Sequence, residues 1–179
     1  MAVNSDTLSD LFHSRMSKKE AILVAGLFVQ KPEQIAELLD FLHSDDPKSS
    51  PQASWILGTI WESEASIVEP YQGEIIGIIL STGHDSIRRN LLRIVESFAI
   101  PEDSLGILFD RCMEWYISDV YAPAVRANAL QVLYRISCAE PLLTGEVIAQ
   151  IEMMNDYGSP ALKARSRMVL KKLKKLKYT

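Results

Sequence analysis

The feature that most constrains the fold of this chain is a nine-residue helical pattern that returns at nearly regular intervals. VRANALQVL begins at Val125, and IRRNLLRIV begins at Ile87. Both copies have an arginine at their second position and an asparagine two residues later. Two weaker copies, LKARSRMVL and PQASWILGT, begin at Leu162 and Pro51, so the spacing is 36 to 38 residues. A period of this length, built from helix pairs, is typical of an α-solenoid.

The best-defined copy belongs to a helix that we expect over residues 122–137. Pro123 suits its first turn, where the missing backbone N–H costs nothing. A single amphipathic helix needs only one apolar stripe. Here the apolar residues form two stripes at helical spacing: Val125, Ala129, Val132, Leu133 and Ile136 on one side, and Ala127, Leu130 and Tyr134 on another. Two stripes predict neighbours on more than one side, as in a stack of helices.

The remaining sequence extends this register into an all-α chain with a single domain over residues 1–179. Ser17 and Glu20 form a capping-box pattern before an apolar run. Gly73 and Gly77 lower helix propensity, which suggests that they permit close helix packing. We expect a leading helix (4–13), hairpins at about 17–43, 51–82, 86–118 and 122–154, and a capping helix (159–177). Helices should start near Pro51, Ser86, Pro123 and Pro160, and partner helices near Pro70, Pro101 and Pro141.

The residues VRANAL, with a proline two residues before the valine, resemble the first helix of HEAT repeats. That resemblance implies a right-handed α-α superhelix whose extended surfaces bind other proteins. The chain also resembles small bacterial HEAT-like proteins that sometimes carry the name adenylosuccinate lyase. True lyases of that superfamily have a Ser-Ser-x-x-Met-Pro-x-Lys-x-Asn loop. Here Ser49-Ser50-Pro51 lacks the Met-Pro-x-Lys, so we expect no lyase activity.

Composition excludes several classes of protein. No apolar run reaches the length that spans a membrane, and the N-terminus has no signal-peptide core. Two cysteines, Cys112 and Cys138, give neither a disulfide framework nor metal-ligand spacing, so we expect the cytoplasm and no cofactor. Residues 1–158 contain 23 acidic and 11 basic residues, whereas residues 159–179 contain eight basic residues and no acidic ones. An acidic body argues against a nucleic-acid groove along it.

Cations recur at one phase of the repeats, between apolar positions. Arg88 and Arg126 occupy this position in the two strong copies, and Lys163 occupies it in the last helix. A buried cation requires a carboxylate or carbonyl partner, and Asp85 and Asp119 are the candidates. We interpret these residues as a structural ladder between repeats rather than a ligand site.

A second cluster combines an aromatic side chain with charges. Trp115 and Asp119 are four residues apart, and Arg111 lies one turn before the tryptophan. This layout is similar to HEAT-like DNA glycosylases that excise alkylated bases, which implies a lesion-binding site as the alternative function. We favour packing for Trp115 because large aromatic side chains mostly contribute buried area.

The final helix has one apolar stripe and a cationic remainder. Its charge suits a terminal cap that faces water, and lysines near a helix C-terminus also suit the helix dipole. The alternative is a contact with an acidic partner through Lys171, Lys172, Lys174 and Lys175.

The leading hypothesis for function is a non-catalytic scaffold or protein-interaction module. The histidines His13, His43 and His84 are far apart and no Cys-x-x-Cys occurs, so we expect no metal site and no enzyme activity. A third interpretation is a homo-oligomer in which a second copy covers an exposed apolar edge. The sequence does not identify the partner.

Overall fold

The computed structural model describes residue 8, residues 11–12, 16–154 and 157–176. Contacts divide the chain into two compact units, Met1–Ile94 and Val95–Thr179. Every regular element in the described part is a helix, and none of its residues lies in a strand. The predicted all-α class is therefore confirmed, and the IIGIIL run lies in a helix.

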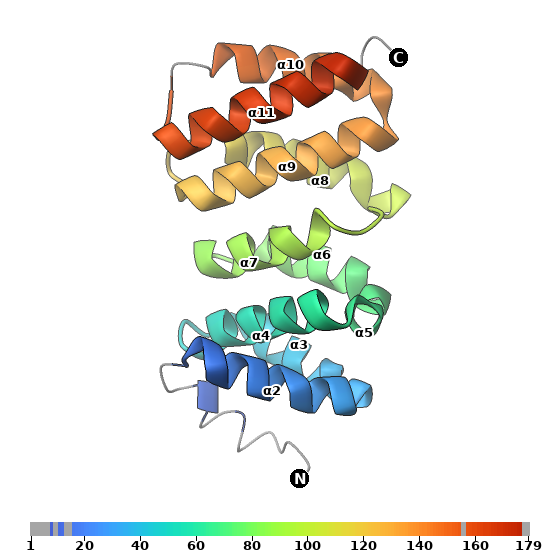
Figure 1. Cartoon of the computed structure of the whole chain (residues 1–179), viewed down its shortest axis with the longest axis vertical. Helices are drawn as coiled ribbons and strands as arrows, with labels where there is room; N and C mark the ends of the chain where they lie inside the picture. Colours follow the sequence, from blue (N-terminus) through green and yellow to red (C-terminus); the bar gives the residue numbers. More distant parts are fainter. Residues whose placement is uncertain (1–7, 9–10, 13–15, 155–156, 177–179) are drawn as a thin grey trace. The chain divides into compact units, whose positions relative to one another are not determined.

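The first unit consists of short helices that pack as hairpins. Helix α4 packs against both α2 and α3, so it contacts both helices of the first hairpin. Figure 1 shows α2 and α4 on the near side of this unit, with α3 behind them. Its elements are α2 (Lys18–Gln30), η1 (Pro32–Gln34), α3 (Ile35–His43), α4 (Ser49–Ser63), α5 (Ala65–Val68), η2 (Glu69–Tyr71), α6 (Gln72–Ser81) and α7 (Asp85–Val95).

The second unit repeats this arrangement with longer helices. Helix α9 packs against α8, α10 and α11, and α10 also packs against α11. Figure 1 shows α9 and α11 in front of α8 and α10. Neighbours on several sides account for the two apolar stripes in the α9 sequence. The elements are α8 (Glu102–Ile117), α9 (Pro123–Ala139), η3 (Pro141–Leu143), α10 (Thr144–Met153) and α11 (Pro160–Leu176).

Helix starts lie close to the residues that the sequence indicated. The four first helices begin at Ser49, Asp85, Pro123 and Pro160. Among the partner helices, α8 follows Pro101 directly, and short 3₁₀ turns that contain Pro70 and Pro141 lead into α6 and α10. Proline fixes φ near its helical value, which is why it marks these starts.

Side-chain caps define the ends of helices in the first unit. The Ser17 backbone N–H donates to Glu20 Oε2 at 2.7 Å, and the Glu20 N–H donates to Ser17 Oγ at 3.3 Å, so the predicted capping box is confirmed. In the next loop, Asp46 Oδ2 accepts the Ser49 N–H at 2.7 Å at the start of α4. The neighbouring Asp45, at φ 49°, accepts the Thr82 hydroxyl at 2.6 Å and ties this loop to the end of α6.

Most of the predicted leading helix (4–13) lies outside the described residues. Its described members Leu8, Leu11 and Phe12 are helical, and Leu8 and Phe12 are buried. The Phe12 ring packs edge-on against Phe41 of α3, with 5.0 Å between ring centroids.

The proposed packing role of Gly73 and Gly77 is wrong. A Cβ atom added to either glycine would have no heavy atom within 4 Å outside the local helix, and both residues are exposed. The apolar surface of α6 is buried through isoleucines instead, namely Ile75, Ile76, Ile78 and Ile79.

Candidate functional site

Arg88 of α7 is buried against the end of the preceding helix α6. Its Nη1 atom contacts Asp85 Oδ1 at 2.9 Å, and Nη2 donates to the backbone carbonyl of Thr82, the C-cap residue of α6. The side chain is only 6% exposed. A cation at this place compensates the partial negative charge of a helix C-terminus, so the arginine fixes α7 against α6.

Arg126 of α9 makes the corresponding contact with the end of α8. Its Nε atom donates to the Tyr116 carbonyl at 3.0 Å, and Nη2 donates to the Ile117 carbonyl at 3.3 Å. The expected partner Asp119 is exposed in the loop after α8, and no ion pair between it and Arg126 exists in the described part of the chain. The reason is that α8 ends at Ile117, so helical spacing does not extend to Asp119.

The ladder does not continue with an ion pair in the last helix. Lys163 is half-buried, and no ion pair of its side chain occurs among the residues that the structure describes. Both arginines are buried and donate to carbonyls at the end of the preceding helix, whereas Lys163 is only half-buried.

Trp115 is fully buried in α8, which leaves no aromatic surface there for a flipped base. The Arg111 guanidinium lies 5.9 Å from the centre of its ring and forms an ion pair with Glu114 at 2.6 Å. Asp119 lies beyond the end of the helix, so the three residues do not line a common site in the way that the glycosylase layout requires.

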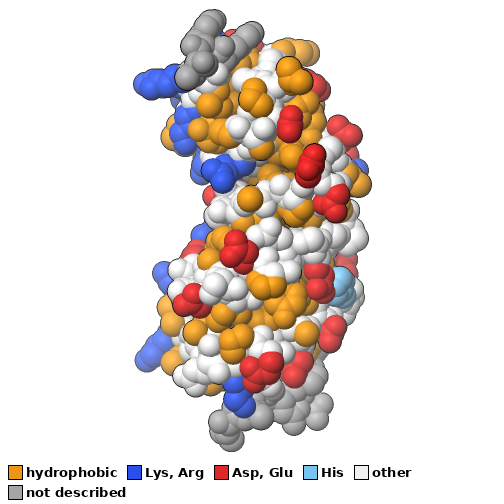
Figure 2. Space-filling model, turned by 90° about the vertical axis from the view of Figure 1, so that its right-hand side faces the viewer, with side chains coloured by type: hydrophobic (Ala, Val, Ile, Leu, Met, Phe, Trp, Pro, Cys, Tyr) orange, Lys and Arg blue, Asp and Glu red, His pale blue; other side chains and the backbone are white. Residues whose placement is uncertain are grey.

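The cationic face of α11 contacts its own unit. Lys174 Nζ lies 2.7 Å from Glu152 Oε1, and the Lys172 ammonium lies 5.1 Å from the centre of the Tyr134 ring. All four predicted contact lysines, including Lys171 and Lys175, are exposed. Figure 2 shows Asp and Glu side chains scattered among apolar ones on the side that it views.

The histidines and cysteines have separate structural surroundings. His43 pairs with Glu74 at 2.7 Å, and His84 Nε2 lies 3.1 Å from the Asp45 carbonyl, whereas His13 lies outside the described residues. Both cysteines are free thiols. Across the described ranges, no group of three or more His, Cys, Asp or Glu side chains is arranged to hold a metal ion.

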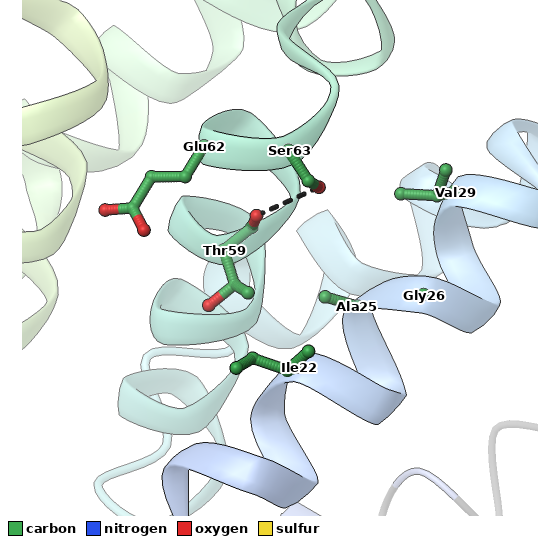
Figure 3. A pocket seen from close by; sticks show the side chains of 7 residues that line it. All are labelled: Ile22, Ala25, Gly26, Val29, Thr59, Glu62 and Ser63. Carbon is green, nitrogen blue, oxygen red and sulfur yellow. Dashed lines mark hydrogen bonds between the residues drawn. The ribbon is translucent and has the colours of Figure 1, made fainter.

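An apolar groove of about 370 Å³ lies between α2 and α4 (Figure 3). Helix α2 supplies Ile22, Ala25, Gly26 and Val29, and α4 supplies Thr59, Glu62 and Ser63. Figure 3 shows the Ile22 side chain pointing toward α4 across the groove, with Thr59 opposite. Ser63 donates its hydroxyl to the Thr59 and Ile60 carbonyls, at 3.2 and 3.0 Å, so this polar group of the wall is satisfied within the helix.

Large apolar side chains of α2 are exposed beside this groove. Ile22 is 52% exposed, Leu23 62% and Leu27 39%. The sequence interpretation missed this surface. Its signal is the run AILVAGLFV, which is apolar around the whole helix although only part of the helix circumference is covered.

A second groove, of about 430 Å³, lies between α4 and α7 and is more polar. Trp55 and Arg89 are among its lining residues. The Asn90 amide donates to Ser54 Oγ at 2.9 Å, and Arg93 pairs with Glu62 at 2.5 Å. These bonds join α7 to α4 and account for much of the polar chemistry of this groove.

These packed hairpins, joined by arginines at successive helix ends, define a helical-repeat protein. The model of a HEAT repeat domain matches residues 8–173, so the chain belongs to the HEAT repeat family. No curated protein and no solved structure matches it. In the described part of the chain, no helix has the length and apolar character needed to cross a membrane. A repeat-based interaction or scaffold role follows from the family.

Proposed function

We propose that this HEAT repeat chain is a non-catalytic protein-interaction module that binds an amphipathic helix of a partner protein in the α2–α4 groove. The observation that carries the proposal is the exposed apolar stripe of α2, formed by Ile22, Leu23 and Leu27. Contiguous apolar surface beside a groove is typical of an interaction site.

The shape and chemistry of the groove support a helical partner. Two helices form its walls, and an amphipathic helix lays its apolar face into such a groove through side chains one turn apart. The polar groups Thr59, Glu62 and Ser63 lie on the α4 side only, so the α2 wall offers apolar contact alone. A partner should therefore bury apolar side chains against α2 and present polar groups toward α4.

The burial of Trp115 favours binding over the glycosylase alternative, because a buried indole offers no face to a flipped base. The free thiols Cys112 and Cys138 support a reducing compartment such as the cytoplasm.

The proposal is tested with two leucine-to-aspartate variants, one in the proposed surface and one as a matched control. The Leu23→Asp variant places a charge on the apolar stripe of α2, and Leu142→Asp makes the same change at a leucine that is 93% exposed in the second unit. Both leucines are exposed, so both variants should keep the far-UV circular dichroism of the parent chain. Tagged chains then capture partners from a lysate of the source organism, with quantitative mass spectrometry.

The expected result is a protein captured by the parent chain and by Leu142→Asp but lost from Leu23→Asp. Equal recovery of every captured protein by both variants would contradict the proposed surface. Light scattering of the purified chains tests whether a second copy of this chain occupies the groove. A parent dimer that Leu23→Asp converts to a monomer would identify a second copy as the occupant.

A further inference from the structure

A cleft of about 410 Å³ lies in the second unit, lined from the end of α8 and the segment before α11. Its walls combine apolar and polar side chains. The apolar ones are Ile117, Met154 and Tyr157, and the polar ones are Ser118, Asp119 and Arg126. Ile117 is 39% exposed and Tyr157 66%, so both offer apolar contact area at the surface.

The Arg126 guanidinium is the buried charge of this cleft. The residue is 6% exposed and lines the cavity, and its two hydrogen bonds go to the carbonyls of Tyr116 and Ile117. A guanidinium has five N–H donors, so three remain after these bonds. Helix-end carbonyls offset part of the charge. In the described part of the chain no carboxylate forms an ion pair with Arg126.

Comparison with Arg88 of α7 shows that Arg126 lacks an acidic partner. Arg88 pairs with Asp85, which is the first residue of α7 and stands three residues before the arginine. In α9 the first residue is Pro123, also three residues before its arginine. Proline supplies no carboxylate, so the guanidinium of Arg126 keeps its carbonyl contacts but loses the acidic partner that its counterpart has.

We propose that the Arg126 cleft binds a glutamate or aspartate side chain of a partner protein, flanked by apolar residues. Buried arginine and carboxylate form strong, bidentate hydrogen bonds, and burial strengthens them. Ile117 and Tyr157 would contact the flanking apolar side chains. Asp119 also lines the cleft, but it is exposed, so water and salt screen its repulsion of an incoming carboxylate. This inference rests on the proposed role as a protein-interaction module.

The test uses two blocked peptides that differ only in charge, Ac-Leu-Glu-Leu-NH₂ and Ac-Leu-Gln-Leu-NH₂. Binding to the intact ¹⁵N-labelled chain is followed by NMR through the Arg126 Nε–Hε signal and the amides of residues 117–119. The glutamate peptide should shift these signals saturably, and the glutamine peptide should bind about tenfold or more weakly. Propionate should bind more weakly than the glutamate peptide, because it lacks the apolar side chains.

The sharpest variant restores the acidic partner instead of deleting the arginine. Pro123→Asp recreates the Asp85–Arg88 arrangement, so it should fold, compete for the guanidinium and weaken the glutamate peptide about tenfold or more. Pro123→Ala, which removes the proline without adding charge, should bind like the parent. In a Tyr157→Ser variant the apolar wall is shortened, and binding should weaken while the fold is kept.

Several results would overturn the proposal. Equal binding of the two peptides would show that the cleft does not recognise the glutamate charge. Equal binding of the glutamate peptide by Pro123→Asp and by the parent chain would show that Arg126 does not contact the carboxylate. Propionate as tight as the peptide would leave a free-carboxylate site without a protein partner. None of these results depends on the α2–α4 groove. The proposal that this groove binds a partner helix is tested separately, by the capture experiment with Leu23→Asp.

Discussion

Replacing Arg88 by methionine tests whether buried arginines hold consecutive helices together. Methionine keeps most of the apolar stem of arginine and removes the guanidinium, so the change isolates the charge and its hydrogen bonds. The variant leaves the Thr82 carbonyl at the end of α6 without this donor and leaves Asp85 without its cation.

The magnitude follows from the burial of the three groups. Removing one member of a buried ion pair costs about 3–5 kcal/mol when the other member stays buried and unsolvated. The Asp85 side chain is 35% exposed and regains water, whereas Thr82 is 4% exposed and its carbonyl loses a donor. A buried carbonyl without its partner costs about 1–3 kcal/mol. We therefore expect a loss of about 2–3 kcal/mol in the free energy of unfolding.

Urea unfolding followed by circular dichroism measures this loss, and thermal unfolding gives a second reading. For a unit of this size the melting temperature should fall by roughly 10 °C or more. The matched control is Asp85→Asn, which keeps the arginine and its carbonyl contact and should cost under about 1 kcal/mol, because the carboxylate is partly exposed. If Arg88→Met stays within about 0.5 kcal/mol of the parent, as an ordinary surface change does, the ladder does not stabilise the fold.

Three further predictions follow from other residues. Gly77→Ala should raise the free energy of unfolding by up to about 1 kcal/mol, because the glycine is exposed in α6 with free space around it; a decrease in denaturation midpoint would contradict this. Burial raises the pKa of the Cys112 thiol, so at pH 8 a thiol reagent should label the exposed Cys138 quickly and Cys112 only on unfolding, and rapid labelling of both would refute that burial. The basic face of α11 should bind a short DNA duplex weakly or not at all, even at low salt, because Lys172 and Lys174 contact their own unit. Steeply salt-dependent binding that disappears in the charge-reversed variant Lys171/Lys172/Lys174/Lys175→Glu would instead show a phosphate contact.

The sequence predicted the helices well because their starts depend on local chemistry. Pro123 and Pro160 begin α9 and α11, and the capping box at Ser17 begins α2, since each signal acts within one helical turn. The hairpin repeat follows from apolar spacing, which is equally local. These signals do not decide how the chain is divided into compact units, because that depends on contacts between distant segments. The single domain and the role of the basic helix stay predictions.

The surroundings of the candidate sites depended on information that no short stretch of sequence contains. Arg126 was expected to find Asp119, but α8 ends at Ile117 and the nearest acceptors are its terminal carbonyls. A backbone carbonyl is present at every residue, so sequence spacing cannot single out the ones that serve. The exposed side of α2 was missed for a related reason: an apolar residue such as Leu23 looks like a core residue until its neighbours are placed.

The arginine contacts also bear on how the chain folds. Arg88 reaches a carbonyl six residues before it, and Arg126 reaches one ten residues before it. Closing loops this short costs little entropy and takes well under a microsecond in an unfolded chain. The junction between one helix and the next is thus set by contacts near in sequence, which favours fast folding. A nascent chain can complete each junction soon after its arginine leaves the ribosome, before the following hairpin has emerged.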